Sequence, residues 1–376
     1  MAINTEDVVR DCMQAINKQY RELKNLNIIV VGKTGVGKST LINTIFRDNL
    51  AKTGTGRPVT ADIRKYTKDN YPLTIYDTPG FELGGKQELE IKDAVKKLIQ
   101  DGVQSRKIEK MIHCIWYCIN VGSNRTLDNS EINWLRSLTE DFSSSNVPVL
   151  VILTQACPRK KAQEMKSDIE RLNLHVAKVL TVLAQAMDFD GEYTAEAYGL
   201  EELVQVMAEV LPNELKTTFQ NVQIASLAEK KKQSQIAVTT AVTAATVAGA
   251  TPIPFPDMYV LIPIEMTMIA SITVIFGMEP DEGFLTAFLS IILGSGGATL
   301  LGRSAVSAIL KLIPGVNFAA MAISGATAGT LTTALGEAYI GLMEWMFING
   351  KNADYLKSAE GKARMKKDFE NRLHHS

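Results

Sequence analysis

The sequence predicts an α/β domain followed by an all-α domain, and three observations support this fold class. Strand-like and helix-like segments alternate between residues 26 and 212, as a doubly wound sheet requires. A glycine-rich turn at residues 32–39 joins the first of these strands to a helix. After Pro212 the composition changes abruptly to long uncharged stretches of small and apolar residues, which predicts packed helices.

Size and composition limit the classes of protein that fit. A chain of 376 residues with a net charge of −1 has room for two or three domains and no overall attraction to nucleic acid. It has only four histidines, so a histidine-based metal site has little support. The cysteines lack metal-type spacing, and we expect buried free thiols in a reducing cytoplasm at Cys12, Cys114, Cys118 and Cys157.

Residues 1–25 are predicted to form an amphipathic helix. Charged residues near the start, such as Asp7 and Arg10, exclude an apolar signal core. The apolar residues recur at helical spacing, at Val8, Val9, Met13, Ile16 and Tyr20. We therefore expect this helix to pack on another part of the molecule.

The turn at residues 32–39 reads Gly-Lys-Thr-Gly-Val-Gly-Lys-Ser, a complete phosphate-binding loop. It lies between a predicted strand, Leu26–Val31, and a predicted helix that begins at Lys38. The glycines let successive backbone N–H groups point at the phosphates, Lys38 supplies a positive charge, and the Ser39 hydroxyl supplies a ligand for Mg²⁺. The residues expected to contact the nucleotide here are Lys33, Thr34, Gly35, Val36, Gly37, Lys38, Ser39 and Thr40.

A second motif, Asp77-Thr78-Pro79-Gly80, follows a short predicted strand at Leu73–Tyr76. A carboxylate at the tip of that strand can hold the hydration shell of Mg²⁺ opposite Ser39. The Gly80 N–H can then contact the γ-phosphate. Thr60, in the loop between the two motifs, is our choice for a further Mg²⁺ ligand, with Thr53 and Thr55 as alternatives.

In order and spacing, Gly32–Thr40, Thr60 and Asp77–Gly80 resemble the first three sequence boxes of the Era-like, septin-like and immunity-related small GTPases. Over residues 26–212 the resemblance implies a Ras-like domain with a mostly parallel six-stranded sheet, GTP/GDP and Mg²⁺ as ligands, and two switch loops. Phe81 stands where Ras-type enzymes carry a water-orienting Gln. The resemblance therefore implies hydrolysis that is slow until a partner or a second copy, in a homodimer of these domains, completes the site.

The fourth box departs from the family pattern. A predicted strand, residues 147–153, ends in Thr154-Gln155-Ala156-Cys157, whereas the family has an Asp at the position of Cys157. A thiol cannot replace a carboxylate that accepts two hydrogen bonds from guanine. GTP stays the expected nucleotide, with ATP or a relaxed choice of base as the alternative. Thr154, Gln155 and, from a weak fifth box, Ala184 are the expected contacts on the base side.

Arg125 is a further candidate for catalysis. It follows a predicted strand at Met111–Ile119 and precedes a predicted helix at Leu127–Leu138, so it lies at the edge of the sheet that faces the nucleotide in this fold. It is either a charge-stabilising residue, supplied within the chain or across a dimer, or an ordinary solvated or ion-paired loop residue.

The second half is predicted to form an apolar helical domain at residues 236–348. A polar helical connector, residues 213–235, precedes it, and a basic-leaning tail, residues 349–376, follows. Three uncharged runs approach the about 18–20 residues that a bilayer-spanning helix needs, at 236–256, 284–302 and 312–336. Small residues at helical spacing permit close helix contacts in lipid or in water.

Two interpretations of these helices stay open. In the first they lie in or on a membrane, and Lys230–Lys232 and the tail contact anionic headgroups. In the second they form the interior of a soluble bundle, because Asp257 and Glu265 lie in the most apolar stretch, where lipid would penalise them. We expect a compact domain that associates conditionally with the inner face of the cell membrane, peripherally or by insertion.

The turn at residues 252–257, Pro-Ile-Pro-Phe-Pro-Asp, resembles a domain of unknown function attached to bacterial Era-like GTPases. That resemblance implies a helical, often membrane-associated module with no catalytic role of its own. The whole chain is thus expected to be a Mg²⁺-dependent GTPase that switches a helical domain. A nucleotide-gated scaffold with little turnover is the alternative, and a channel-like membrane protein is a third.

Overall fold

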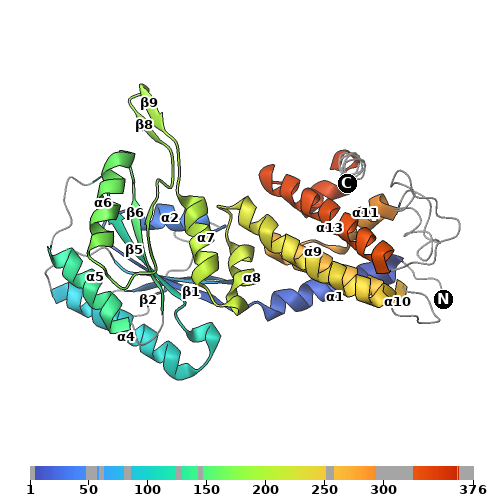
Figure 1. Ribbon diagram of the computed structural model, residues 1–376, viewed down its shortest axis with the longest axis horizontal. Helices are drawn as coiled ribbons and strands as arrows, with labels where there is room; N and C mark the ends of the chain where they lie inside the picture. The colour runs from blue at the N-terminus through green and yellow to red at the C-terminus, as the bar shows by residue number, and fades with distance from the viewer. Residues whose placement is uncertain are drawn as a thin grey trace. The chain divides into compact units, whose positions relative to one another are not determined.

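The computed structural model describes residues 5–47, 57–58, 63–79, 86–122, 129–142, 147–250, 258–293, 325–361 and 363. The chain divides into two units, which Figure 1 shows in ribbon form. The sheet unit is Leu23–Ser226, and the helical unit combines Met1–Glu22 with Leu227–Ser376. The segment predicted at residues 1–25 is therefore divided: residues up to Glu22 belong to the helical unit, and residues 23–25 belong to the sheet unit.

The sheet unit is built on five parallel strands. β1 (Leu26–Val31) lies between β4 (Tyr71–Asp77) and β5 (Cys114–Asn120). β6 (Val149–Thr154) and β7 (Lys178–Thr181) continue the sheet beyond β5. β1 and β6 are buried along their whole length, as expected for strands covered on both faces.

The sixth predicted strand, β3 (Arg64–Lys68), pairs antiparallel with β4, and a two-residue strand, β2 (Arg57–Pro58), adds a seventh at the edge. The predicted fold class is confirmed. The strand expected from Met111 begins at Cys114 instead, because a short 3₁₀ helix, η1 (Ile108–Lys110), occupies the chain just before it.

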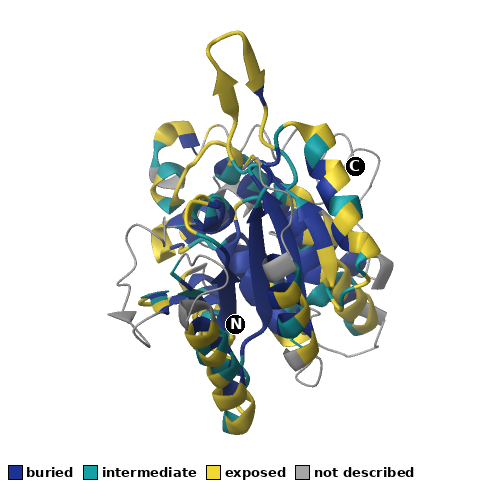
Figure 2. Cartoon of the chain, turned by 90° about the vertical axis from the view of Figure 1, so that its left-hand side faces the viewer, coloured by how far each residue is buried: buried dark blue, intermediate teal, exposed yellow. Residues whose placement is uncertain are grey.

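Helices cover both faces of the sheet, because alternate residues of each central strand point to opposite faces. Ile28 and Val30 belong to the core beneath α2 (Lys38–Ile45) and α7 (Leu200–Val210). Ile29 belongs to the core on the other face. That face is covered by α4 (Lys86–Ser105), α5 (Asn129–Phe142) and α6 (Arg159–Arg171). The burial colours of Figure 2 show dark strands between helices that are exposed only on their outer sides.

The sheet unit extends past the boundary predicted at Pro212. The predicted connector is divided between α8 (Asn213–Val222), which belongs to the sheet unit, and α9 (Leu227–Ala250), which belongs to the helical unit. Phe219 of α8 is fully buried, with its ring centroid 6.5 Å from that of Phe46. Because α8 supplies core residues to the sheet, it is a part of that unit rather than a linker.

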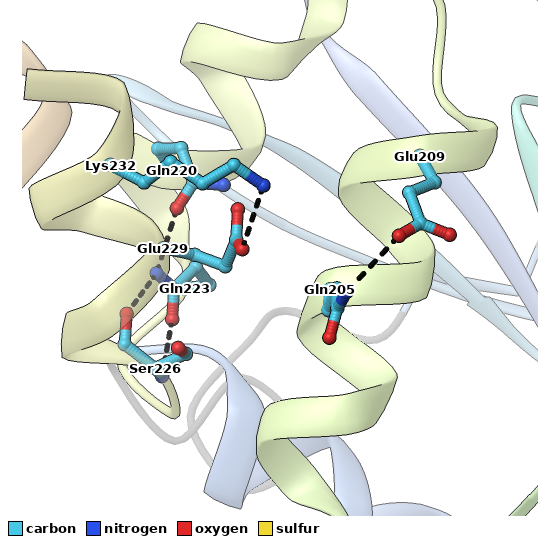
Figure 3. Close-up of polar contacts among 7 residues, drawn as sticks. All are labelled: Gln205, Glu209, Gln220, Gln223, Ser226, Glu229 and Lys232. Atoms are coloured by element: carbon cyan, nitrogen blue, oxygen red, sulfur yellow. Dashed lines mark hydrogen bonds and ion pairs between the residues drawn. The ribbon is translucent and has the colours of Figure 1, made fainter. Parts of the chain in front are cut away.

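Gln223 closes the sheet unit after α8 (Figure 3). Its buried side-chain amide donates to Gln220 Oε1 at 2.9 Å and to the Ser226 carbonyl at 2.8 Å, and its Oε1 accepts from the Ser226 N–H at 2.9 Å. A side chain whose donors and acceptor are all paired is stable in the interior. The boundary therefore falls at Ser226.

In the helical unit, α1 (Thr5–Glu22) packs on α10 (Met258–Phe276) and α11 (Glu282–Leu293). The apolar stripe predicted for this segment makes the contact, because Val8, Val9 and Ile16 are buried. Two polar contacts add direction to the packing: Gln19 Nε2 donates to Ser271 Oγ at 3.0 Å, and the Tyr20 hydroxyl donates to the Met278 carbonyl at 2.5 Å.

Small residues bring α9 close to α13 (Gly325–Ile348), as their helical spacing predicts. A Cβ at Gly336 would meet Val238 at 2.6 Å, and one at Gly329 would meet Thr246 at 2.6 Å. Ala241 and Ala245 of α9 are buried. A short 3₁₀ helix, η3 (Ala353–Lys357), follows α13.

The predicted contact of Lys230 with headgroups is wrong. Lys230 is fully buried, and its Nζ donates to the Ile275 carbonyl at 2.8 Å and lies 5.9 and 5.7 Å from the ring centroids of Phe276 and Phe347. It therefore caps the end of α10. Lys232 remains 61% exposed beside Glu229, at 3.3 Å.

No helix within the described ranges is both long and apolar enough to cross a bilayer. The turn at 252–257, including Asp257, lies outside the described residues, as do residues 294–302 of the run at 284–302, residues 312–324 of the run at 312–336, and the tail beyond 363. Glu265 lies in α10, and the Thr332 hydroxyl donates to its Oε1 at 3.3 Å.

Glu265 gives the protein a testable pH dependence. Burial raises the pKa of this carboxyl from 4.5 to about 7, although the Thr332 hydrogen bond lowers it. Between these two values the folded state holds a proton that the unfolded state has released, so stability falls as the pH rises from about 5 to 7 and is level above that. Glu265→Gln should remove this slope and raise the free energy of unfolding at pH 8 by on the order of 3 kcal/mol.

Urea unfolding at pH 5.5 and pH 8 measures the Glu265 effect. The exposed Glu282→Gln variant on α11 is the matched control, and its slope should equal that of the parent chain. The prediction would be contradicted if the free energy of unfolding depended on pH to the same extent in the parent chain and in the Glu265→Gln variant.

Candidate functional site

The glycine-rich loop joins β1 to α2, and its backbone geometry requires glycine. Gly32 has a φ of 151°, and a Cβ there would lie 2.4 Å from the Cys118 carbonyl oxygen of β5. Gly35 and Gly37 have φ values of 76° and 91°, a region that side chains other than glycine rarely adopt. The loop turns back into α2, where the Leu41 N–H donates to the Gly37 carbonyl at 3.0 Å.

The loop is held in place by its neighbours. Thr154, at the end of β6, lies with its hydroxyl 2.5 Å from the Val36 carbonyl and 3.1 Å from the Ile119 carbonyl. Lys33 forms an ion pair with Glu131 of α5 at 3.1 Å, and both side chains are largely buried. Thr34, Gly35, Ser39 and Thr40 are exposed, so this side of the loop is open to a ligand.

Lys38 lies inside the loop. Its Nζ donates to the Gly32 carbonyl at 2.7 Å and to the Lys33 carbonyl at 3.2 Å, and the residue is 8% exposed. Burial lowers the pKa of this ammonium group, and the charge of Asp77 opposes that shift. A cation enclosed by a loop of backbone groups is suited to hold phosphate.

Asp77 ends β4 next to the loop. The Thr78 N–H donates to the Val30 carbonyl at 3.1 Å, which ties the end of β4 to β1. Asp77 Oδ1 is buried and has no hydrogen-bond partner among the described residues. Burial raises the pKa of this carboxyl to about 6, although Lys38 and Arg64 act to lower it. An unpaired buried carboxylate oxygen is unfavourable by itself and favours a cation or an ordered water shell beside it.

Thr60, Gly80 and Arg125, together with Phe81, lie outside the described residues. Their predicted parts in the switch loops and in catalysis therefore stay predictions.

Gln155 connects the base side of the site to the loop. It has a φ of 48°, and its Nε2 donates to the Gly35 carbonyl at 3.1 Å. Asn120, the last residue of β5, donates to Gln155 Oε1 at 3.3 Å and accepts from the Gly122 N–H at 2.6 Å. The sequence analysis did not select Asn120 or Glu131. The position of Asn120 at the carboxyl end of a central strand was a usable signal, whereas nothing in the sequence pairs Glu131 with Lys33.

Cys157 and Ala184 lie at the ends of neighbouring segments. The Ala156 N–H donates to the Val182 carbonyl at 3.2 Å, which holds the segment after β6 against the segment after β7. Tyr198 supports this corner, since its hydroxyl donates to the Ala156 carbonyl at 2.5 Å. Ala184 and Cys157 are both half-buried. The position of the family's carboxylate thus holds a half-buried thiol in a well-supported segment.

The structure therefore brings together Lys33 to Thr40, Asp77, Thr154 and Gln155 around one loop. The arrangement offers backbone N–H groups, one enclosed ammonium, one unpaired carboxylate oxygen and an exposed hydroxyl. This combination suits a polyphosphate with a divalent cation.

Comparisons with known proteins agree with this geometry. Residues 27–155 match the family model described as "50S ribosome-binding GTPase", and residues 213–359 match a "Domain of unknown function (DUF697)". The second match begins at α8, which the structure places in the sheet unit. The sequence match and the structural boundary therefore differ by one helix.

Curated relatives match the chain over part of its length. The chain is 32% identical over 170 residues to a probable GTP-binding protein EngB from Thermoanaerobacter pseudethanolicus, covering 44% of this chain and 81% of that protein. It is 29% identical over 150 residues to mouse (Mus musculus) septin-9, covering 34% of this chain and 26% of the septin. A crystal structure of a probable GTP-binding protein EngB is 19% identical and covers 49% of this chain and 97% of its own, with a TM-score of 0.35.

These matches confirm the predicted septin-like resemblance and the C-terminal domain, while the Era-like resemblance stays a prediction. The loop geometry, the Asp77 position and the 32% identity over four-fifths of an EngB protein point the same way. The chain belongs to the P-loop GTPases related to EngB and the septins, and it carries a C-terminal domain of unknown function.

Proposed function

We propose that this chain is a Mg²⁺-dependent GTP switch that hydrolyses GTP slowly and acts on its own helical unit. The observation that carries the proposal is Asp77 Oδ1, which is buried, feels the charge of the enclosed Lys38 ammonium and has no hydrogen-bond partner within the described part of the chain. A nucleotide with its metal would satisfy both groups at once.

Each proposed residue has a distinct part. The N–H groups of the loop from Lys33 to Gly37 bind the phosphates, and Lys38 exchanges its contacts with the Gly32 and Lys33 carbonyls for contacts with the β- and γ-phosphates. Ser39 and Asp77 hold the metal directly or through water, with Thr60 as a third contact. Bound Mg²⁺ supplies positive charge that offsets the charge on the transferring phosphoryl group. Thr60 and Gly80 would leave the site once the γ-phosphate is gone.

Slow turnover follows from the residue at position 81. A phenyl ring cannot orient water by hydrogen bonding, so the site lacks that contribution at Phe81. A second copy, pairing sheet unit to sheet unit, is the proposed source of the missing group, and Arg125 is the candidate to act across the pair.

GTP is the proposed nucleotide, with weak discrimination between bases. The Cys157 thiol cannot accept the two hydrogen bonds that a carboxylate accepts from guanine. We expect GTP, ITP and ATP to bind within about tenfold of one another, and Cys157→Asp to raise the preference for GTP by about 10- to 100-fold. Competition against a fluorescent GTP analogue measures the three affinities.

Cys157→Ser is the matched control for the base prediction, because it keeps the size of the side chain and adds no charge. It should leave the ratios of the three affinities unchanged. A parent chain that already binds GTP more than about a hundredfold better than ITP would contradict the prediction.

The helical unit is the proposed output, through conditional contact with a membrane surface on the cytoplasmic side. An open apolar groove on this unit supports it, with Ile236 and Val247 respectively 54% and 65% exposed and the partly exposed Lys232 at its end. An exposed apolar surface on a helix, with a lysine at one end, suits the interface of an anionic bilayer. The net charge of −1 gives no support to a nucleic-acid partner.

Phosphate release from GTP tests the proposal. We expect low turnover at nanomolar protein, a rise with protein concentration, and a further change with anionic liposomes. Asp77→Asn should remove the Mg²⁺ dependence of nucleotide binding. Turnover that stays at background at every concentration, with or without liposomes, would instead favour the second candidate, a nucleotide-gated scaffold. Phe81 and Cys157 are the residues that motivate this second candidate.

A further inference from the structure

A two-stranded hairpin projects from the sheet unit (Figure 2). β8 (Met187–Phe189) and β9 (Tyr193–Ala195) pair with each other and with no other described strand. The turn is well built: Asp190 and Gly191 have φ values of 54° and 76°, and the Glu192 N–H donates to the Phe189 carbonyl at 3.0 Å. Three residues, Asp190 to Glu192, therefore connect the paired Phe189 and Tyr193, and Asp-Gly is favoured where both central residues of a turn have positive φ.

One face of this hairpin is apolar, and Met187, Phe189 and Tyr193 on it are exposed, whereas Ala195 is buried. Met187 pairs with Ala195, and Phe189 pairs with Tyr193, so these four side chains share a face. Phe189 and Tyr193 stack with centroids 6.2 Å apart, yet they are 43% and 65% exposed. An isolated two-stranded hairpin is only marginally stable in water, and aromatic side chains gathered on its face favour a partner.

The negative charge of the hairpin indicates which chemical class of partner could bind it. Residues 185–197 contain no Lys or Arg and carry four carboxylates, at Asp188, Asp190, Glu192 and Glu196. Anionic lipid and nucleic acid would be repelled by this charge. A protein surface with positive charge is the complementary partner.

The same end of the sheet unit carries such a surface. The first turn of α6 contains Arg159, Lys160 and Lys161 and no acidic residue. The N-terminus of a helix already carries partial positive charge, so the cations in this turn add to the positive potential at the start of α6. Arg159 and Lys160 are exposed, and Arg159 lies 4.2 Å from the ring centroid of Tyr198.

Tyr198 also ties the root of the hairpin to this turn, since it pairs with Leu183 across an antiparallel bridge. The acidic β8–β9 hairpin and the basic first turn of α6 therefore belong to one continuous surface. This surface lies next to the part of the site where the nucleotide base is expected. A surface with adjacent, opposite charges is complementary to a copy of itself turned by a twofold axis.

We infer that two copies of this chain pair through this surface, each placing its β8–β9 hairpin on the first turn of α6 of the other. The inference rests on the second copy named in the proposed function and assigns the surface that copy would use. Opposite charges steer the encounter, and burial of the stacked Phe189 and Tyr193 holds the pair.

Sedimentation velocity of the full chain, across concentrations and with and without GTP, tests the pairing. Asp190→Lys with Glu192→Lys should weaken the dimer by at least about tenfold, and so should Arg159→Glu with Lys160→Glu. All four substitutions together should return the dimer to within about threefold of the parent chain. The matched control is Asp93→Lys with Asp101→Lys, two exposed carboxylates of α4, and it should leave the dimer unchanged.

Rescue by the fourfold variant separates this contact from self-association through the apolar helical unit, which charge reversal here would not move. Phe189→Ser with Tyr193→Ser should also weaken the dimer while circular dichroism and GTP affinity stay at parent values. A monomer at every concentration, a dimer insensitive to both reversals, or a fourfold variant no better than either double variant would overturn the inference. None of these outcomes bears on GTP binding, so the GTP switch stands or falls separately.

Discussion

Replacing Lys38 with Ala is expected to weaken GTP binding by more than about a hundredfold. Charge-assisted hydrogen bonds are worth about 1.5–3 kcal/mol each, and the ammonium is placed to make two of them with phosphate in an enclosed loop. It is buried and already donates two hydrogen bonds to backbone carbonyls of this loop, so it is held where the phosphates would lie. Isothermal titration calorimetry with GTP and Mg²⁺ measures the change.

Lys97→Ala is the matched control, because Lys97 is an exposed lysine on α4 of the same unit. Its GTP affinity should equal that of the parent chain. Circular dichroism of Lys38→Ala should show a folded protein, since the substitution removes two hydrogen bonds within the loop and none within the helices or strands. Unchanged affinity of a folded Lys38→Ala chain would reject the loop as the nucleotide site.

Gly32→Ala is expected to lower the free energy of unfolding of the nucleotide-free protein by at least about 3 kcal/mol. The new Cβ would lie 2.4 Å from the Cys118 carbonyl oxygen, and the opposing atom is backbone in a central strand that cannot shift cheaply. The substitution therefore forces the first turn of the loop away from β5.

Gly35→Ala is the matched control within the same loop. Its φ of 76° also disfavours a side chain, but a Cβ there meets nothing within 4 Å, so only about 1–2 kcal/mol of backbone strain is expected. Urea unfolding followed by tryptophan fluorescence reports on this unit, because Trp116 and Trp134 are buried in it. Equal losses in the two variants would show that the close approach to Cys118 does not matter.

Local sequence patterns predicted the loop and the sheet, because their chemistry is encoded within a few residues. The pattern from Gly32 to Ser39 requires its own backbone shape, and the apolar runs at β1 and β6 are compatible only with buried strands. Asp77 was predicted by its position at the end of such a run. For these elements the sequence was sufficient.

Contacts between distant residues were not predictable in this way. Asn120 and Gln155 meet because β5 and β6 are neighbours in the sheet, and Lys33 meets Glu131 across 98 positions of sequence. Lys230 looked like part of an exposed basic run, yet it is buried between Phe276 and Phe347 because α9, α10 and α13 pack together. Helix α8 was predicted to be part of a connector, because its contacts with the core involve strands that are distant in the sequence.

The sequence by itself determined the glycine-rich loop between a strand and a helix, because the backbone N–H groups and the lysine proposed to bind phosphate are contiguous in the chain. Only the tertiary structure decided which unit each helix joins, that no described residue pairs with Asp77 Oδ1, and that an acidic hairpin lies on one surface with a basic helix start. Those properties depend on which segments pack together, and packing brings together residues that no local pattern relates.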